Sequence, residues 1–338
     1  MTCWRAVRTW NNQALPMTDS EITPLRLLVS SAIKAASSHN TQPWKFRLEP
    51  RRITVIPDFT RRCAAVDPDD HHLFASLGCA VENLVITAPS IGLFAHPVFD
   101  ERTGEVRIEL ESTSPSTSAL LPAIDLRQCS RNQYDGSALT PAEARMLEEA
   151  ARGGGVSLRL ITGRRAMEAI AEFVAAGNSI QFADPEWRRE LQHWIRFNAR
   201  TARDTGDGLY GPCMGNPAVP DWIGRLFMHM AFSAKKQNRK DASHILHSSA
   251  VAVIVSERDD RTHWVEAGRS YERLALQAAA LDLRTAFVNQ PVEVAALRTQ
   301  FAAHLHLDAA QRPDMLIRIG RGPKMPRSFR RAVENVIV

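Results

Sequence analysis

The chain has 338 residues, of which 44% are hydrophobic and 23% are charged, the balance of a globular protein large enough for two domains of ordinary size. A net charge of +5 would suit a nucleic-acid partner, but the basic residues are spread along the chain and form no stripe with interleaved aromatics, so no such partner is expected. No apolar run approaches the ~20 residues of a membrane span, and the first residues lack the apolar stretch of a signal peptide. The sequence therefore predicts a cytoplasmic protein without a membrane partner.

The first part of the chain predicts a helix, a turn, a strand and a second helix. Thr23-Pro24 begins the first helix, and the small polar run Ser37–Gln42 predicts a turn. Trp44–Leu48 alternates like a half-buried strand. A long buried helix starts near Asp67, whose side chain can cap it, and ends at Gly92. Further strands are predicted at 52–57, 106–111, 250–255 and 316–319.

The later part of the chain repeats some of these features. Thr140-Pro141 begins a helix with Leu147 and Ala151 on one face, and a strand follows at 156–161. Residues 75–93 align without gaps to 265–283, with both segments predicted as long buried helices. The pairs that match at this constant offset are Gly78 with Gly268, Glu82 with Glu272, Leu84 with Leu274, Ala88 with Ala278 and Leu93 with Leu283.

The repeat predicts an α+β fold built from two related halves, residues 1–125 and 126–338, packed as an intrachain pseudo-dimer. A glycine in mid-helix costs about 1 kcal/mol relative to alanine, so its recurrence favours duplication over a shared composition of two buried helices. The halves are unequal, because Ser37–Gln42 of the first corresponds only to Gly153-Gly154-Gly155 in the second. One good binding site is therefore expected, not two.

Metal and disulfide chemistry are not predicted. The cysteines are odd in number, scattered and never spaced C-x-x-C. Asp69-Asp70-His71-His72 looks metal-like, but it is better explained at a helix start as acids favoured by the helix dipole and exposed histidines. His244 and His247 lack a third ligand. The cysteines are Cys3, Cys63, Cys79, Cys129 and Cys213.

The run from Ser37 to Trp44, followed by Arg127-Gln128-Cys129-Ser130-Arg131 and a Pro-rich turn with a double arginine near the C-terminus, resembles the nitroreductase family. Within it the chain is most similar to the Acg-like branch, in which two nitroreductase halves fused in one polypeptide hold one FMN. The resemblance covers about 22–338 and implies a nitroreductase-like fold.

The resemblance assigns the Arg-rich pentapeptide to the flavin. Arg127 would pair with the phosphate, Gln128 and Cys129 would contact the ribityl chain, and Arg131 would face the O2/N1 edge of the ring. The family usually has Ser or Thr where Cys129 stands, and a thiol is a poor donor. An exposed basic loop is the alternative interpretation.

Three more segments complete the expected site. Arg330 and Arg331 would form a second phosphate clamp, unless they belong to a basic surface tail. The loop after the second long helix would lie near flavin N5 and offer main-chain contacts through Val288, Asn289 and Gln290. Ser37, Ser38 and His39 would reach the flavin from the first half, while Asn40 and Gln42 stabilise the turn and Trp44 belongs to the core.

A Gly/Pro-rich segment around 204–222 is expected to be a lid, since a loop of this length in a compact domain is usually a functional cover or disordered. Acg-like proteins have a similar excursion here. Leu209, Tyr210 and Met214 are predicted to close over the ring.

The predicted function is an FMN-dependent oxidoreductase that takes a hydride from NAD(P)H and passes two electrons to a small electron-poor or conjugated acceptor. A flavin-sequestering or storage protein without turnover is the alternative from another class. A third reading has the reduced flavin serving another reaction, such as desaturation. Further association of the pseudo-dimer is left open.

Overall fold

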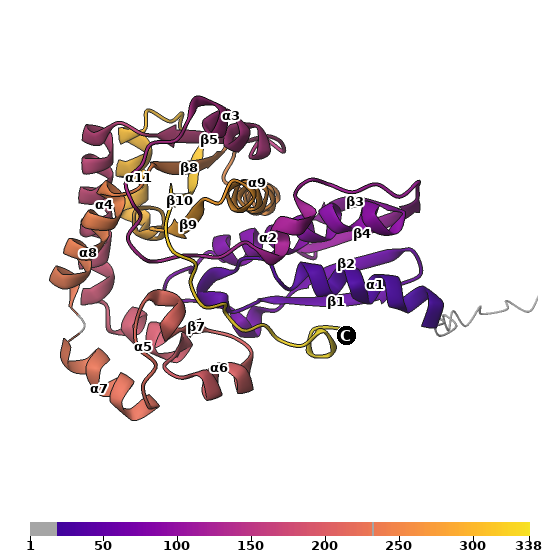
Figure 1. Ribbon diagram of the computed structural model, residues 1–338, viewed down its shortest axis with the longest axis horizontal. Helices are drawn as coiled ribbons and strands as arrows, with labels where there is room; N and C mark the ends of the chain where they lie inside the picture. Colours follow the sequence, from indigo (N-terminus) through magenta and orange to yellow (C-terminus); the bar gives the residue numbers. More distant parts are fainter. Residues whose placement is uncertain (1–18, 232) are drawn as a thin grey trace, which may run out of the picture.

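Two four-stranded antiparallel sheets lie on either side of two long central helices in the computed structural model, which describes residues 19–231 and 233–338 (Figure 1). The strand orders are β1-β2-β4-β3 and β5-β8-β10-β9, so each sheet places its strands as first, second, fourth and third in chain order. Helix α2 falls between the second and third strands of one sheet, and α9 has the same place in the other. The α+β fold class is confirmed, and both halves share one topology.

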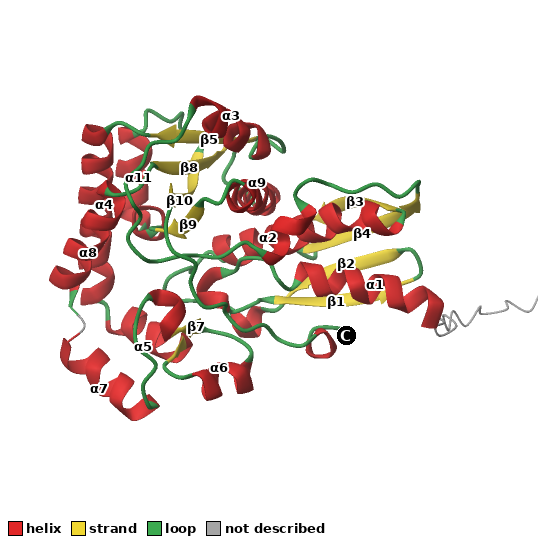
Figure 2. Cartoon of the chain, viewed as in Figure 1, coloured by secondary structure: helices red, strands yellow, loops and turns green. Residues whose placement is uncertain are grey.

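The element bounds are as follows, and Figure 2 shows how they are distributed. The strands are β1 (Trp44–Glu49), β2 (Arg52–Pro57), β3 (Leu93–Asp100), β4 (Glu105–Ser112), β5 (Val156–Ile161), the two-residue parallel pair β6 (Ile195–Arg196) and β7 (Leu209–Tyr210), β8 (Ala250–Ser256), β9 (Arg284–Phe287) and β10 (Arg312–Gly320). The helices are α1 (Asp19–Ala32), α2 (His71–Thr87), α3 (Pro141–Ala150), α4 (Arg164–Ala183), α5 (Pro185–Trp194), α6 (Ala199–Thr205), α7 (Asp221–Ala231), α8 (Ala234–Leu246), α9 (Arg261–Ala280), α10 (Gln290–Glu293) and α11 (Ala295–His304).

Most of the predicted elements are present, and the differences have local causes. Helix α1 begins at Asp19 and not at Thr23, because Pro24 removes one N–H bond without ending the helix. Strand β3 was not predicted because it contains Pro97, which is tolerated here since β3 is an edge strand. The capping box at Thr140 and Glu143 fixes the start of α3 where the sequence placed it.

Helices α2 and α9 cross at the two glycines that the repeat aligns. A Cβ atom on Gly78 would lie 1.9 Å from the backbone oxygen of Val265, and one on Gly268 would lie 1.8 Å from that of Ala75. Ala75 and Val265 are themselves an aligned pair, so the two contacts are reciprocal. The helices approach so closely that only a residue without a side chain fits at either point.

The halves differ in what joins their first two strands. A tight hairpin links β1 to β2, whereas α4 through α8 intervene between β5 and β8. The C-terminal segment leaves the second sheet and pairs with β1, where Phe46 donates to Val336 O at 2.7 Å and Val338 donates to Phe46 O at 3.0 Å. Figure 1 shows this segment crossing from one half to the other.

By length and composition alone, the stretch His71–Ile91 is long and apolar enough to cross a membrane, although no such segment was predicted from the sequence. However, 78% of its apolar window is buried inside the protein. It is accounted for as the core helix of the fold.

We expect Gly78→Ala or Gly268→Ala to lower the free energy of unfolding by about 1–3 kcal/mol, since the added methyl overlaps backbone of the opposite helix and forces α2 and α9 apart. Urea unfolding followed by circular dichroism measures the change. Gly163→Ala is the matched control, because its Cβ would meet nothing within 4 Å. Equal stability of all three variants would contradict the close crossing.

Candidate functional site

A cavity of about 790 Å³ lies between the halves. Its walls come from α2 and the Ser37–Gln42 turn of the first half, and from α8, the 286–290 loop, the C-terminal segment and the α5–α7 excursion of the second. Of the predicted flavin-contacting residues, all but one line it. Those that do are Ser37, Ser38, His39, Arg127, Gln128, Cys129, Arg131, Val288, Asn289, Gln290 and Arg330.

The turn that follows Ser37 has an unusual backbone. His39, Asn40 and Gln42 adopt φ angles of 49°, 55° and 54°, in the left-handed region that residues other than glycine rarely enter. Such strain costs of order 1–3 kcal/mol per residue and persists only where surrounding contacts fix it. Within the turn, Ser37 Oγ accepts from the Gln42 N–H at 3.1 Å.

Contacts with two distant segments hold this turn in place. Asn40 Nδ2 donates to the carbonyls of Gly208 and Phe329, both at 3.1 Å. Gln42 Nε2 donates to Gly206 O at 2.8 Å, while its Oε1 accepts from the Arg331 N–H at 2.9 Å. Asn40 and Gln42 therefore join the turn to the 204–222 segment and to the C-terminal segment.

Two buried guanidinium groups form a basic end of the cavity. Arg127 Nε lies 3.2 Å from Glu272 Oε1, and Arg127 Nη2 donates to Lys34 O at 3.1 Å. Arg330 Nη2 donates to the carbonyls of Lys34 and Ala35, and its buried Nε has no partner. Burial and the nearby Arg127 lower the pKa of Arg330 to about 10. Two cations share one carboxylate here, so the end suits a phosphate-like anion.

The remaining pentapeptide residues have different surroundings. Gln128 exchanges two hydrogen bonds with the backbone of Met325, at 2.7 and 3.1 Å. Cys129 is half-buried and pairs its backbone with Thr285. Arg131 Nη1 lies 3.9 Å from Met214 Sδ, so the predicted lid meets a predicted ring-edge cation.

The 286–290 loop meets the cavity beside α10. The Val288 N–H donates to Leu316 O at 2.9 Å, and Asn289 Oδ1 accepts from the Leu316 N–H at 2.8 Å. Gln290 Nε2 donates to Asn178 Oδ1 at 3.1 Å, while its Oε1 is buried without a partner. These bonds fix the loop and leave one amide oxygen free for a ligand.

Arg331 does not line the cavity. Its guanidinium donates to the carbonyls of Gln42, Trp44 and Asn335, which fastens the C-terminal segment to β1. The double arginine thus divides between two tasks, with Arg330 turned to the cavity and Arg331 to the backbone.

The α5–α8 region contributes more residues to the cavity wall than the sequence predicted. Leu209, Tyr210 and Met214 line the cavity, as do Ile223 and Phe227 of α7. One face of α8 also lines it. The residues of this face are three or four positions apart, a helical spacing that can be recognised in the sequence. The residues of that face are Ser233, Lys236, Gln237, Lys240, Asp241 and His244.

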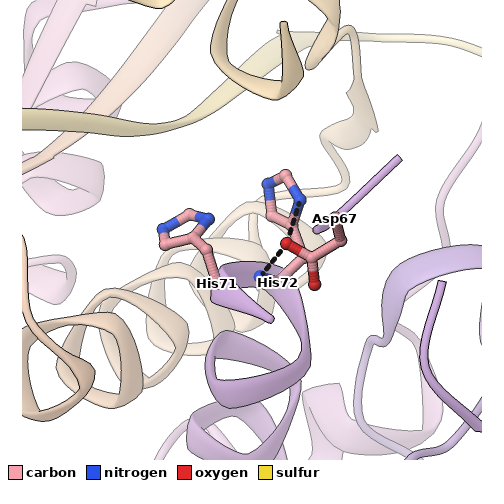
Figure 3. A group of neighbouring side chains, drawn as sticks. All are labelled: Asp67, His71 and His72. Atoms are coloured by element: carbon pink, nitrogen blue, oxygen red, sulfur yellow. Dashed lines mark hydrogen bonds and ion pairs between the residues drawn. The ribbon is translucent and has the colours of Figure 1, made fainter. Parts of the chain in front are cut away.

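His71 and His72 are not exposed, so the sequence interpretation was wrong on this point. Both are buried with Asp67 at the start of α2 (Figure 3), because the 63–70 segment folds back over the helix end. Burial lowers the pKa of both histidines and raises that of Asp67 to about 7.

The group formed by Asp67, His71 and His72 has one ligand atom per residue within 4.8 Å of the others. Asp67 already accepts from the backbone N–H groups of His72 and Leu73 at 3.0 Å, and His71 Nε2 lies 2.8 Å from Asp314 Oδ1. Asp67 and His71 are therefore already engaged in hydrogen bonds, and those of Asp67 close the N-terminal end of α2.

The described cysteines, Cys63, Cys79, Cys129 and Cys213, are all free, as the spacing predicted, while Cys3 lies outside the described residues. Trp44 is fully buried and belongs to the core.

Two proteins of Mycobacterium tuberculosis strain H37Rv are similar to this chain over nearly its whole length. "Putative NAD(P)H nitroreductase Rv3131" is 27% identical over 93% of this chain and 90% of that protein. "Putative NAD(P)H nitroreductase acg" is 24% identical over 95% of this chain and 97% of that protein. The chain is thus similar over nearly its whole length to proteins named as NAD(P)H nitroreductases, of which Acg is one.

No protein-family model matches this chain. Among solved structures, a nitroreductase with bound FMN from Bacteroides fragilis is 12% identical, with a TM-score of 0.38 over 64% of this chain and 96% of that one. A nitroreductase-like family protein from Bacillus cereus is 13% identical, with a TM-score of 0.38 over 64% of this chain and 92% of that one.

Burial, with smaller effects of Arg131 and His72, lowers the pKa of His39 from 6.5 to about 3. The unfolded chain therefore takes up a proton at lower cost than the folded one, and the free energy of unfolding should fall as pH drops from 6.5 toward 3. We expect His39→Gln to weaken this pH dependence in urea unfolding between pH 7 and 4. Identical slopes for both proteins would show that His39 is not buried as a neutral imidazole.

Proposed function

We propose that this protein is an FMN-dependent oxidoreductase that holds a single flavin in the cavity between its halves. One observation carries the proposal. Two buried guanidinium groups that share a single carboxylate, those of Arg127 and Arg330, line the same cavity as the left-handed Ser37–Gln42 turn. The Acg-like relatives, named as NAD(P)H nitroreductases, support the reaction class and the hydride donor.

The proposal of one site rests on the inequality of the halves. Gly153, Gly154 and Gly155 stand where the first half carries its turn. A Cβ on Gly154 would lie 2.3 Å from Glu266 Oε2, and one on Gly155 would lie 2.9 Å from His263 Nε2. Side chains of α9 already occupy that space, so the related position in the second half favours packing over a ligand.

The residues present fit FMN. Arg127 and Arg330 would hold its phosphate, Gln128 and Cys129 would border the ribityl chain, and the turn would reach it from the first half. When bound, FMN supplies hydride and electron transfer between donor and acceptor.

The chain's own contribution is orientation and charge. Arg131 brings a cation into the cavity, and none of the described carboxylates forms an ion pair with it, so it would stabilise negative charge there. The 286–290 loop presents Asn289 and Gln290 to the same space. Leu209, Tyr210 and Met214 would exclude water from above.

We expect the purified protein to be yellow, with one FMN per chain, and to lose its absorbance near the flavin maximum when NADPH or NADH is mixed in a stopped-flow instrument. Arg127→Gln and Arg330→Gln should each weaken FMN binding about tenfold or more, since each removes a charged contact. Arg145→Gln, an exposed arginine of α3, is the control. Colourless protein that refuses added FMN would reject the proposal.

The turnover arm of this experiment separates catalysis from storage. Multiple turnovers with an electron-poor acceptor support an enzyme. Slow flavin exchange without electron transfer to any acceptor supports the sequestering protein.

We expect FMN to slow amide hydrogen exchange in residues 204–222, because Gly206 and Gly208 accept bonds from the Ser37–Gln42 turn and Tyr210 and Met214 line the cavity. Mass spectrometry of the protein with and without FMN measures this. The exposed turn between β3 and β4, residues 101–103, provides the internal reference. Unchanged exchange in 204–222 would reject the lid.

A further inference from the structure

A second group of basic side chains lies on the cavity wall formed by α8 and β10, apart from Arg127 and Arg330. Lys240 and His244 lie one helical turn apart on the cavity-facing side of α8. Arg318 of β10 lines the same cavity. Burial, with a smaller effect of the Arg318 guanidinium, lowers the pKa of His244 to about 4, so the cations of this wall are Lys240 and Arg318.

Arg318 is held firmly but has an unused donor. Its side chain is buried, with 2% exposed, and its Nη2 donates to the carbonyls of Ser130 and Asn132 at 3.2 and 2.8 Å. Its guanidinium also stacks 4.2 Å from the ring of Tyr134. Nη1 is buried and has no partner, although burial of an unpaired charged donor is unfavourable.

The acids nearby do not fully neutralise this wall. Asp241 is the carboxylate on the same face of α8, where its oxygens accept hydrogen bonds from the amides of Asn178 and Gln237 at 2.8 Å, and its charge offsets one cation. Glu293 Oε2 accepts from Gln181 Nε2 at 2.6 Å, and burial raises the pKa of Glu293, which disfavours its charge. Lys240, Arg318 and Arg131 therefore leave an excess of positive charge.

Other parts of the cavity lining are apolar. Trp187 and Leu191 of α5, with Phe197 after β6, face the same space. A ligand placed there would find cations at one side and aromatic and aliphatic surface at the other.

We infer that this wall is a subsite for the second reactant, and that this reactant is an organic anion: an apolar body that carries a carboxylate or phosphate group toward Lys240 and Arg318. The ligand's role as a reactant rests on the proposed function, but the binding of an anion at this wall does not depend on turnover. The anionic group belongs either to the acceptor or to the 2′-phosphate that distinguishes NADPH from NADH.

The test is equilibrium binding of two matched probes, para-nitrobenzoate and para-nitrobenzamide, to the purified protein by isothermal titration calorimetry. We expect the anionic probe to bind more tightly. Lys240→Gln should weaken its binding about tenfold and leave the neutral probe unchanged, because only the anion loses a charged partner. Lys240→Arg should retain the preference, and Lys235→Gln, on the same helix but not on the cavity wall, should change neither probe.

NADP⁺ and NAD⁺ measured in the same way identify the source of the anion. A loss of affinity for NADP⁺ alone in Lys240→Gln assigns the subsite to the donor's phosphate, and a loss for para-nitrobenzoate assigns it to the acceptor. Equal affinity of the wild-type protein for both nitro probes and for both nucleotides would overturn the inference. So would a loss of flavin in Lys240→Gln, since the wall would then belong to the cofactor.

Flavin content is read separately from the visible spectrum of each sample. Colourless protein that still prefers the anionic probe rejects the proposed function and keeps the subsite. Yellow protein that reacts with NADPH but does not distinguish the probes or the nucleotides does the reverse.

Discussion

The reciprocal contact of Gly78 and Gly268 is the constraint on which the rest of the structure depends. Each glycine meets the backbone of the opposite helix, so α2 and α9 cross at a distance that no side chain would permit. Because α2 carries one sheet and α9 the other, this crossing sets how the halves face each other. The cavity is what remains beside the crossing, with His72 and Ser76 of α2 in its wall.

Symmetry of topology does not extend to the loops. The strand orders match, yet the first half has a hairpin where the second has the α4–α8 excursion. That excursion covers the cavity from one side, and the C-terminal segment covers it from another before it pairs with β1. Unequal loops on equal frameworks favour a single enclosed site, since connecting segments tolerate insertion far better than packed helices do.

The left-handed turn at Ser37–Gln42 is maintained by contacts from both covering segments. The side-chain amides of Asn40 and Gln42 bind Gly206, Gly208, Phe329 and Arg331, so the turn, the 204–222 segment and the C-terminal segment form one hydrogen-bonded unit. Any displacement of the 204–222 segment would therefore disturb the turn. The basic end of the cavity has a net positive charge, because its two guanidinium groups outnumber the single carboxylate of Glu272.

The sequence by itself determined the strands with alternating or continuous apolar runs, the paired helices and a minority of the cavity-lining residues, among them eleven predicted to contact the flavin, since periodicity and local motifs are properties of short segments. Tertiary structure alone decided the rest. It buried His71 and His72, which look exposed in isolation, and it turned Arg330 inward but its neighbour Arg331 onto β1. It also brought Arg318 and one face of α8 to the same cavity. Burial and side-chain partners depend on residues distant in the chain, which no local pattern encodes.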